Sequence, residues 1–155
     1  MRFSTKTRYG IRAMLEIAVN EKQGGVFQKD IAENQHISNK YLDQIIYALK
    51  AAGLICNVKG KKSGYMLMRR PSEITVLDIH NAFEHGICII DCMCPTFFCE
   101  MKDTCMVQGF WGRLNSLIND YLQNATLEDF MNRRELIECL NDSQPQDCVS
   151  RVGQS

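Results

Sequence analysis

The sequence of 155 residues lacks any apolar run that approaches the roughly 18 residues of a membrane-spanning helix. Its first fifteen residues are charged throughout and contain no apolar core of the length found in a signal peptide. It also shows no nucleophile–base pair, no phosphate-binding glycine loop, no internal repeat and no low-complexity segment. These absences disfavour a membrane protein, a secreted protein and an enzyme, and they predict a cytoplasmic location.

The chain also lacks net charge, but its charged residues are unevenly distributed. Residues 1–70 hold thirteen Lys/Arg and five Asp/Glu, a net charge of +8. Residues 71–155 hold five Lys/Arg and thirteen Asp/Glu, a net charge of −8. A basic front half predicts a polyanionic partner, and an acidic back half predicts a different role. The alternative is chance patchiness of a solvated surface.

The segment SNKYLDQIIYALKAAG, residues 38–53, has the pattern of a DNA-reading helix. Ser38 suits the N-cap and Gly53 the position after the C-terminus. Apolar residues form one helical stripe and polar residues a second, so one face packs and the other is exposed. A short helix near residues 28–34 and a three-residue turn precede it, which indicates a helix-turn-helix. The residues predicted to face DNA are Ser38, Asn39, Lys40, Tyr41, Asp43 and Gln44.

Two further segments complete a predicted DNA-binding domain over residues 1–85. A first helix at residues 5–20 has one apolar face, formed by Ile11, Met14, Leu15 and Ala18. The strand-like runs LICNVK and YMLMRR, joined by GKKSG, predict a β-hairpin with a basic tip. The expected fold is mainly α with a small β-hairpin, a winged helix-turn-helix. The tip residues predicted to contact phosphates or the minor groove are Lys59, Lys61 and Lys62.

The back half is predicted to hold a dimerisation helix. Thr75 with Asp78, and Thr126 with Asp129, match the capping box that begins a helix, at about residues 76–84 and 126–140. A long amphipathic helix is expected between them, at about residues 106–123. Its apolar face is predicted to pack against a two-fold copy of itself. The alternative is that it packs against the first helix of the same chain. Residues 107–142 are assigned to this dimerisation helix and the C-terminal helix that follows it. Residues 143–155 are assigned to a loose tail. The predicted interface residues are Phe110, Leu114, Leu117, Ile118 and Tyr121.

Four of the eight cysteines lie in the stretch DCMCPTFFCEMKDTC, within a predicted loop at residues 86–106. In a cytoplasmic protein such clustered thiols favour metal or redox chemistry over a disulfide framework. A zinc site, an iron–sulfur cluster and a thiol switch all remain open from the spacing alone. Cys88, just before the stretch, is expected to be a small buried side chain. The candidate metal ligands are Cys92, Cys94, Cys99 and Cys105.

Several stretches together resemble the IscR/NsrR-type winged-helix iron–sulfur transcriptional regulators over nearly the whole chain. They are MRFSTKTRYGIRAMLEIA, DIAENQHISNKYLDQIIYALKAAGLICNVKGKKSGYML, and C-x5-C at residues 99–105 followed by Trp111. The resemblance implies a homodimer that binds a double-stranded DNA operator. It also implies a 2Fe–2S or 4Fe–4S cluster that senses redox state, iron–sulfur status or nitric oxide.

The resemblance assigns Cys99 and Cys105 as two cluster ligands. The positions of the family's usual fourth ligands hold Gln108 and Arg8 here, and neither side chain suits iron. We therefore predict that both Cys92 and Cys94 bind, which gives an all-cysteine site within one protomer. A zinc-dependent or cluster-free thiol regulator is the alternative. A metal-stabilised interaction module without DNA binding is the alternative from a different class.

Overall fold

The computed structural model describes residues 3–20, 24–58, 64–84 and 86–133. The chain is mainly helical with one small antiparallel hairpin, which confirms the predicted fold class. No helix within the described ranges has the length and apolar character needed to cross a membrane. A last helix begins at residue 127 and is described to residue 133. The elements are α1 (Thr5–Asn20), α2 (Gln28–Gln35), α3 (Asn39–Ala51), β1 (Ile55–Asn57), β2 (Tyr65–Leu67), η2 (Pro71–Glu73), α4 (Val76–Asn81), η3 (Asp91–Met93) and α5 (Gln108–Asn124).

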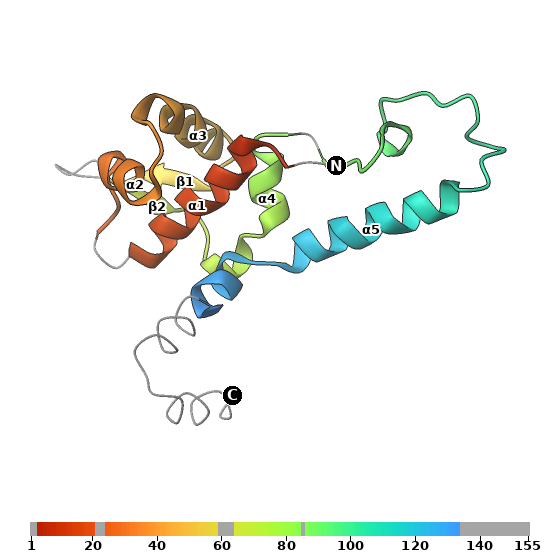
Figure 1. Cartoon of the computed structure of the whole chain (residues 1–155). Helices are drawn as coiled ribbons and strands as arrows, with labels where there is room; N and C mark the ends of the chain where they lie inside the picture. The colour runs from red at the N-terminus through yellow and green to blue at the C-terminus, as the bar shows by residue number, and fades with distance from the viewer. Residues whose placement is uncertain (1–2, 21–23, 59–63, 85, 134–155) are drawn as a thin grey trace, which may run out of the picture.

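One hydrophobic core is formed by side chains of α1, α2, α3 and the hairpin. These elements lie together at one end of the molecule in Figure 1. The apolar stripe predicted for α3 is confirmed, because its members are almost completely buried. The face predicted for α1 is only partly right: Met14 and Ala18 are buried, whereas Ile11 and Leu15 are half-buried. Helix α1 is covered from a second side by α4, so its buried surface is wider than one stripe. The buried residues of α3 are Leu42, Ile45, Ile46 and Leu49.

The wing sheet is shorter than the sequence suggests but gains an extra pairing partner. Strands β1 and β2 pair in antiparallel register, with Cys56 opposite Met66. Val26, just before α2, pairs with Tyr65 through two backbone hydrogen bonds of 3.0 and 2.8 Å. This close approach needs Gly64, since a Cβ there would lie 2.9 Å from the carbonyl carbon of residue 25. The wing lysines Lys59, Lys61 and Lys62 lie outside the described residues, so their contacts stay a prediction.

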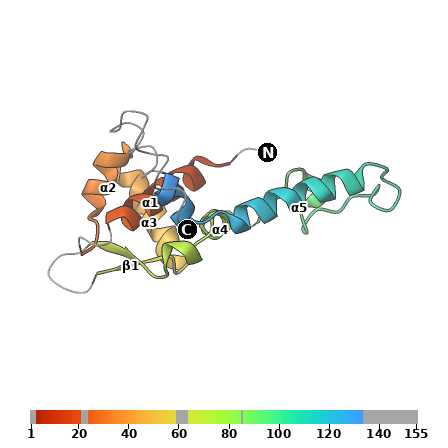
Figure 2. The same cartoon turned by 90° about the horizontal axis from the view of Figure 1, so that it is seen from below.

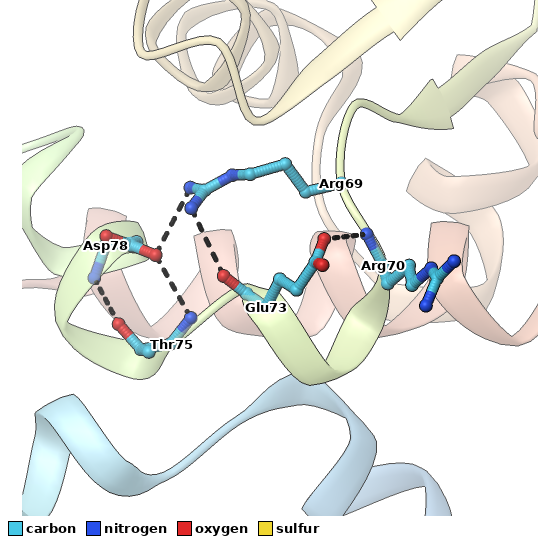
Figure 3. A network of polar contacts seen from close by, with 5 residues as sticks. All are labelled: Arg69, Arg70, Glu73, Thr75 and Asp78. Atoms are coloured by element: carbon cyan, nitrogen blue, oxygen red, sulfur yellow. Dashed lines mark hydrogen bonds and ion pairs between the residues drawn. The ribbon is translucent and has the colours of Figure 1, made fainter.

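A polar network joins the end of the wing to the start of α4 (Figure 3). The predicted capping box is confirmed, since the Asp78 amide donates to Thr75 Oγ1 at 3.1 Å and the Thr75 amide donates to Asp78 Oδ2 at 3.2 Å. Arg69 extends it by donating to Asp78 Oδ2 at 3.2 Å and to the Glu73 carbonyl at 3.1 Å. The network fixes the angle at which the chain leaves the wing.

Helix α5 and the cysteine loop, residues 86–107, project to one side of the helical bundle (Figure 1, Figure 2). Two asparagines of α5 hold the start of the loop: Asn115 Oδ1 accepts from the Ile89 amide at 3.1 Å, and Asn119 donates to the Ile87 carbonyl at 3.4 Å. The chain then returns to the bundle, where the Val76 amide donates to the Ala125 carbonyl at 2.8 Å. The second capping box is confirmed by hydrogen bonds between Thr126 and Asp129.

Candidate DNA-binding surface and cysteine loop

The first turns of α3 present a polar face to solvent. Ser38 caps the helix, since its Oγ accepts a hydrogen bond from the Tyr41 amide at 3.4 Å. Tyr41 is half-buried, and its ring packs edge-on against Tyr9 of α1 at 5.8 Å between ring centroids. Tyr41 therefore helps to seat α3 on α1, and its contact with DNA stays a prediction. The other five residues predicted to face DNA are exposed side by side: Ser38, Asn39, Lys40, Asp43 and Gln44.

One of these residues, Asp43, is already hydrogen-bonded within the protein. The side-chain amide of Gln28, the first residue of α2, donates to Asp43 Oδ1. The Tyr65 hydroxyl of β2 donates to Gln28 Oε1 at 3.0 Å. The pKa of Tyr65 is raised, first by partial burial and then by the negative charge of Asp43. Nothing in the sequence pattern singles out Gln28 or Tyr65, because the pairing of Val26 with β2 brings them together.

A buried carboxylate fixes the turn between α2 and α3. Glu16 of α1 is only 7% exposed and accepts from Asn34 at 2.7 Å, from Gln35 at 2.8 Å and from Asn20 at 3.1 Å. Asn34 and Gln35 are the last residues of α2, and the next residue, His36, turns the chain with a φ of 51°. Sequence reasoning missed this contact, although a glutamate within the apolar repeat of α1 was a usable signal.

The cysteine loop contains two kinds of cysteine. Cys88 is half-buried and forms a disulfide with Cys94, so the prediction of a small buried side chain is wrong. Cys92, Cys99 and Cys105 are free and half-buried. Within the described ranges, no group of three or more His, Cys, Asp or Glu side chains could hold a metal ion in this arrangement. The predicted ligands Cys92, Cys94, Cys99 and Cys105 are thus not gathered into one site, and this arrangement supports neither zinc nor a cluster.

A buried polar cluster joins the start of the cysteine loop to α1. His80 of α4 is 3% exposed, its Nδ1 lies 3.3 Å from Thr7 Oγ1, and its Nε2 lies 3.1 Å from the Gly86 carbonyl oxygen. Thr7, which is fully buried, also donates to Glu84 at 3.1 Å. Hydrogen bonds from Ser4 and Thr7, with the nearby His80, hold the pKa of Glu84 below its usual value, although partial burial opposes them. The N-terminus of α1, α4 and the loop therefore share one polar joint.

The outward face of α5 exposes large apolar side chains. Phe110 is 62%, Leu117 60% and Tyr121 74% exposed, and Leu114 lies between them half-buried. The fifth predicted interface residue differs, because Ile118 packs inward on a small cluster that includes Val76, Ile87 and Leu122. The structure thus separates an outward stripe of four residues from an inward face that holds the loop and α4. Whether the stripe forms a dimer interface stays a prediction.

Comparison with known proteins adds relatives for nearly the whole chain. Residues 3–133 match the Rrf2 family, described as iron-dependent transcriptional regulators. The chain is 34% identical over 151 residues to the HTH-type transcriptional regulator IscR of Pectobacterium atrosepticum, which covers 97% of this chain and 90% of that protein. It is 33% identical to IscR of Escherichia coli O139:H28 over 138 residues, which covers 89% of this chain and 85% of that one.

Solved structures show the same similarity in three dimensions. IscR of T. potens superposes with a TM-score of 0.69 at 32% identity, over 86% of this chain and 88% of that one. CymR, the global cysteine regulator of B. subtilis, superposes with a TM-score of 0.74 at 31% identity, over 86% of this chain and 98% of that one. Each of these two matches thus spans more than four-fifths of this chain.

Proposed function

The chain belongs to the Rrf2 family, and on that basis we propose that it is a homodimeric transcriptional regulator whose DNA binding is controlled by an iron–sulfur cluster. Like its relatives, it is a DNA-binding regulator and not an enzyme. The observation that carries the proposal is the exposed polar face of α3 on a packed domain, joined through one polar cluster to a loop of free cysteines.

In the proposed complex, α3 enters the major groove and the wing lies along the neighbouring backbone. The net charge of +8 over residues 1–70 supplies attraction to phosphates. Lys40 suits a phosphate or a guanine. The carboxylate of Asp43 instead accepts from the amino group of cytosine and is repelled by phosphate, so it suits selection among sites. The remaining predicted contacts, Lys59, Lys61 and Lys62, lie at the tip of the wing, outside the described residues.

The proposed dimer pairs the outward stripe of α5 with the same stripe of a second copy. Phe110, Leu114, Leu117 and Tyr121 recur at helical spacing along this face, so a two-fold axis brings like against like. Such a dimer buries side chains that a single chain exposes to water. Two α3 helices then face DNA together, and half-sites of the operator lie about one helical turn apart.

The donor set of the loop fits an iron–sulfur cluster in its chemistry. Cys92, Cys99 and Cys105 are free, and thiolates are the ligands that such clusters use. We assign these three and Cys94 as ligands. Cys94 can bind only after its disulfide with Cys88 is reduced, as cytoplasmic conditions favour. A bound cluster would supply an iron centre that responds to redox state, iron–sulfur supply or nitric oxide.

The residues around the loop can transmit a change in its shape to the DNA-binding surface. Ligand binding and loop ordering are coupled, so a loop that holds iron has one shape. Gly86, at its start, is hydrogen-bonded to His80, which contacts Thr7 of α1. Asn115 and Asn119 tie the next residues to α5. A change in loop shape therefore reaches both α1 and the proposed dimer helix, and it alters the spacing of the two α3 helices.

The test is anaerobic purification followed by visible spectroscopy and analysis of iron and sulfide. We expect visible absorbance with matching iron and sulfide in the wild type and in Cys88→Ala, and loss of both in Cys92→Ala and Cys94→Ala. Operator affinity should differ between cluster-loaded and cluster-free protein. Equal affinity for the two forms would remove the cluster from regulation, and retained iron in Cys94→Ala would remove Cys94 from the ligands.

The disulfide supports a second candidate function, a cluster-free regulator that responds to thiol oxidation. Cys88 and Cys94 already form the pair of sulfurs that such a switch requires. A colourless anaerobic protein whose DNA binding changes with a thiol reductant would favour this candidate. Loss of that response in Cys88→Ser would assign it to this pair.

A further inference from the structure

The contact between Gln28 and Asp43 has only one possible arrangement of donors and acceptors. A carboxylate can only accept, so the amide nitrogen of Gln28 faces Asp43 Oδ1 and its oxygen faces Tyr65. The Tyr65 hydroxyl must then donate to Gln28 Oε1, at 3.0 Å. Hydrogen bonds therefore run in one direction, from the wing strand through the first residue of α2 to the exposed carboxylate of α3.

This chain of hydrogen bonds restricts a side chain that would otherwise move freely. Asp43 is exposed on α3, and exposed side chains exchange rotamers rapidly. With Oδ1 bonded to Gln28, the carboxylate is held in one orientation and Oδ2 remains available to accept another hydrogen bond. Tyr65 and Gln28 are both half-buried, so their side chains are less mobile than an exposed one and can hold the Asp43 carboxylate in place.

We propose that Gln28 is a positioning residue for base recognition, which orients the Asp43 carboxylate toward one base pair, and that Tyr65 orients Gln28. The inference rests on the proposed function, because it assigns Asp43 to a base edge in the major groove. It adds that the preference at this base pair depends on two residues outside the recognition helix. A shift of strand β2 would also reorient the Asp43 carboxylate, because Tyr65 is linked to Asp43 through Gln28.

The geometry separates this role from a general structural one. The three side chains are exposed or half-buried, where a hydrogen bond contributes little to folding. Removing the Gln28 amide should therefore spare the fold and the phosphate contacts, and affect one base pair. A structural role would instead weaken all sites together and lower the thermal midpoint.

The experiment selects bound duplexes from a randomised DNA library and sequences them, for full-length protein. The variants are Asp43→Ala, Gln28→Leu, Tyr65→Phe and the double variant Gln28→Leu/Asp43→Ala, with Tyr9→Phe as a matched control that removes a tyrosine hydroxyl elsewhere in the domain. We expect Asp43→Ala to lower the preference at one base pair of each half-site by about tenfold. Gln28→Leu should lower it at the same base pair, Tyr65→Phe less so, and the double variant no further than Asp43→Ala. Tyr9→Phe should keep the wild-type motif.

The outcomes distinguish the two levels of the proposal. If the wild type enriches a motif but Gln28→Leu enriches the same motif with unchanged preferences, the positioning role is wrong and the DNA-binding function stands. If the wild type enriches no sequence, both fail. If Gln28→Leu does not fold, Tyr65→Phe decides, because it keeps the ring and removes only the hydroxyl: an unchanged motif in this variant would overturn the proposal.

Discussion

Met14 and Met106 are the same type of residue in opposite surroundings. Met14 of α1 is fully buried, whereas Met106, just before α5, is 100% exposed. The contrast extends to the regions that contain them. Among the described residues, the helical bundle holds nearly all the buried apolar side chains, while the loop and α5 expose Phe97, Phe98, Met101, Val107, Phe110, Leu117 and Tyr121.

The difference indicates which part of the molecule is complete as a single chain. In the bundle, most apolar side chains are enclosed, and buried polar groups such as Glu16 and Thr7 have partners. In the projecting region, Leu122 is the only residue that α5 buries. An exposed apolar stripe and three free thiols on one loop are features that a second subunit and a metal cluster would satisfy. The bundle is therefore complete as a single chain and carries the proposed DNA surface, whereas the projecting region holds the features that the proposed second subunit and cluster would cover.

The two methionines give the largest expected effect. Met14→Ala removes a fully buried side chain and should lower the free energy of unfolding by about 3 kcal/mol. Met106→Ala, the matched change in the projecting region, should alter it by less than about 0.5 kcal/mol. Urea unfolding of both variants measures the difference. A comparable loss of stability in Met106→Ala would contradict the difference between the two regions, and would place Met106 against a partner subunit.

Within the bundle, Glu16 tests how strongly the turn before α3 is fixed. Glu16→Gln replaces an oxygen that accepts from an amide with a nitrogen that must donate. We expect a loss of about 2 kcal/mol in unfolding free energy, with a larger relative loss of DNA binding because the end of α2 is released. Urea unfolding and a DNA-binding titration measure the two effects. Glu33→Gln, an exposed change on α2, is the control. Unchanged stability of Glu16→Gln would show that the buried carboxylate is not needed to hold the turn.

Leu117 tests whether a second copy completes the projecting region. Leu117→Glu places a charge in the outward stripe of α5 and should weaken dimerisation at least about tenfold, without unfolding the bundle. Ser116→Glu introduces the same charge one residue away, off the stripe, and should leave the dimer intact. Sedimentation equilibrium gives the dissociation constants. Equal dissociation constants for both variants would remove the stripe from the interface.

The sequence predicted the elements better than it predicted the contacts between them. Both capping boxes, the α3 stripe and the wing follow from local spacing, which a single chain displays directly. The disulfide of Cys88 and the inward position of Ile118 depend on how the loop folds back on α5, and residue spacing does not encode that. The contact of Gln28 with Asp43 likewise depends on a pairing between residues 26 and 65, far apart in the chain.

Glu84 tests the joint between the two regions, with the smallest expected effect. Its folded pKa lies below its unfolded value, so the carboxylate stabilises the fold above pH 4.5, the ordinary value for Glu, and that contribution is lost as the pH falls through the lower folded pKa. Glu84→Gln should therefore be slightly less stable than the wild type at pH 7, and the difference should shrink below pH 4.5. Unfolding free energies from pH 7 to pH 3 measure this, with Glu100→Gln in the exposed part of the loop as the control. A difference that is independent of pH would mean that the contacts of Glu84 with Ser4 and Thr7 do not depend on its charge.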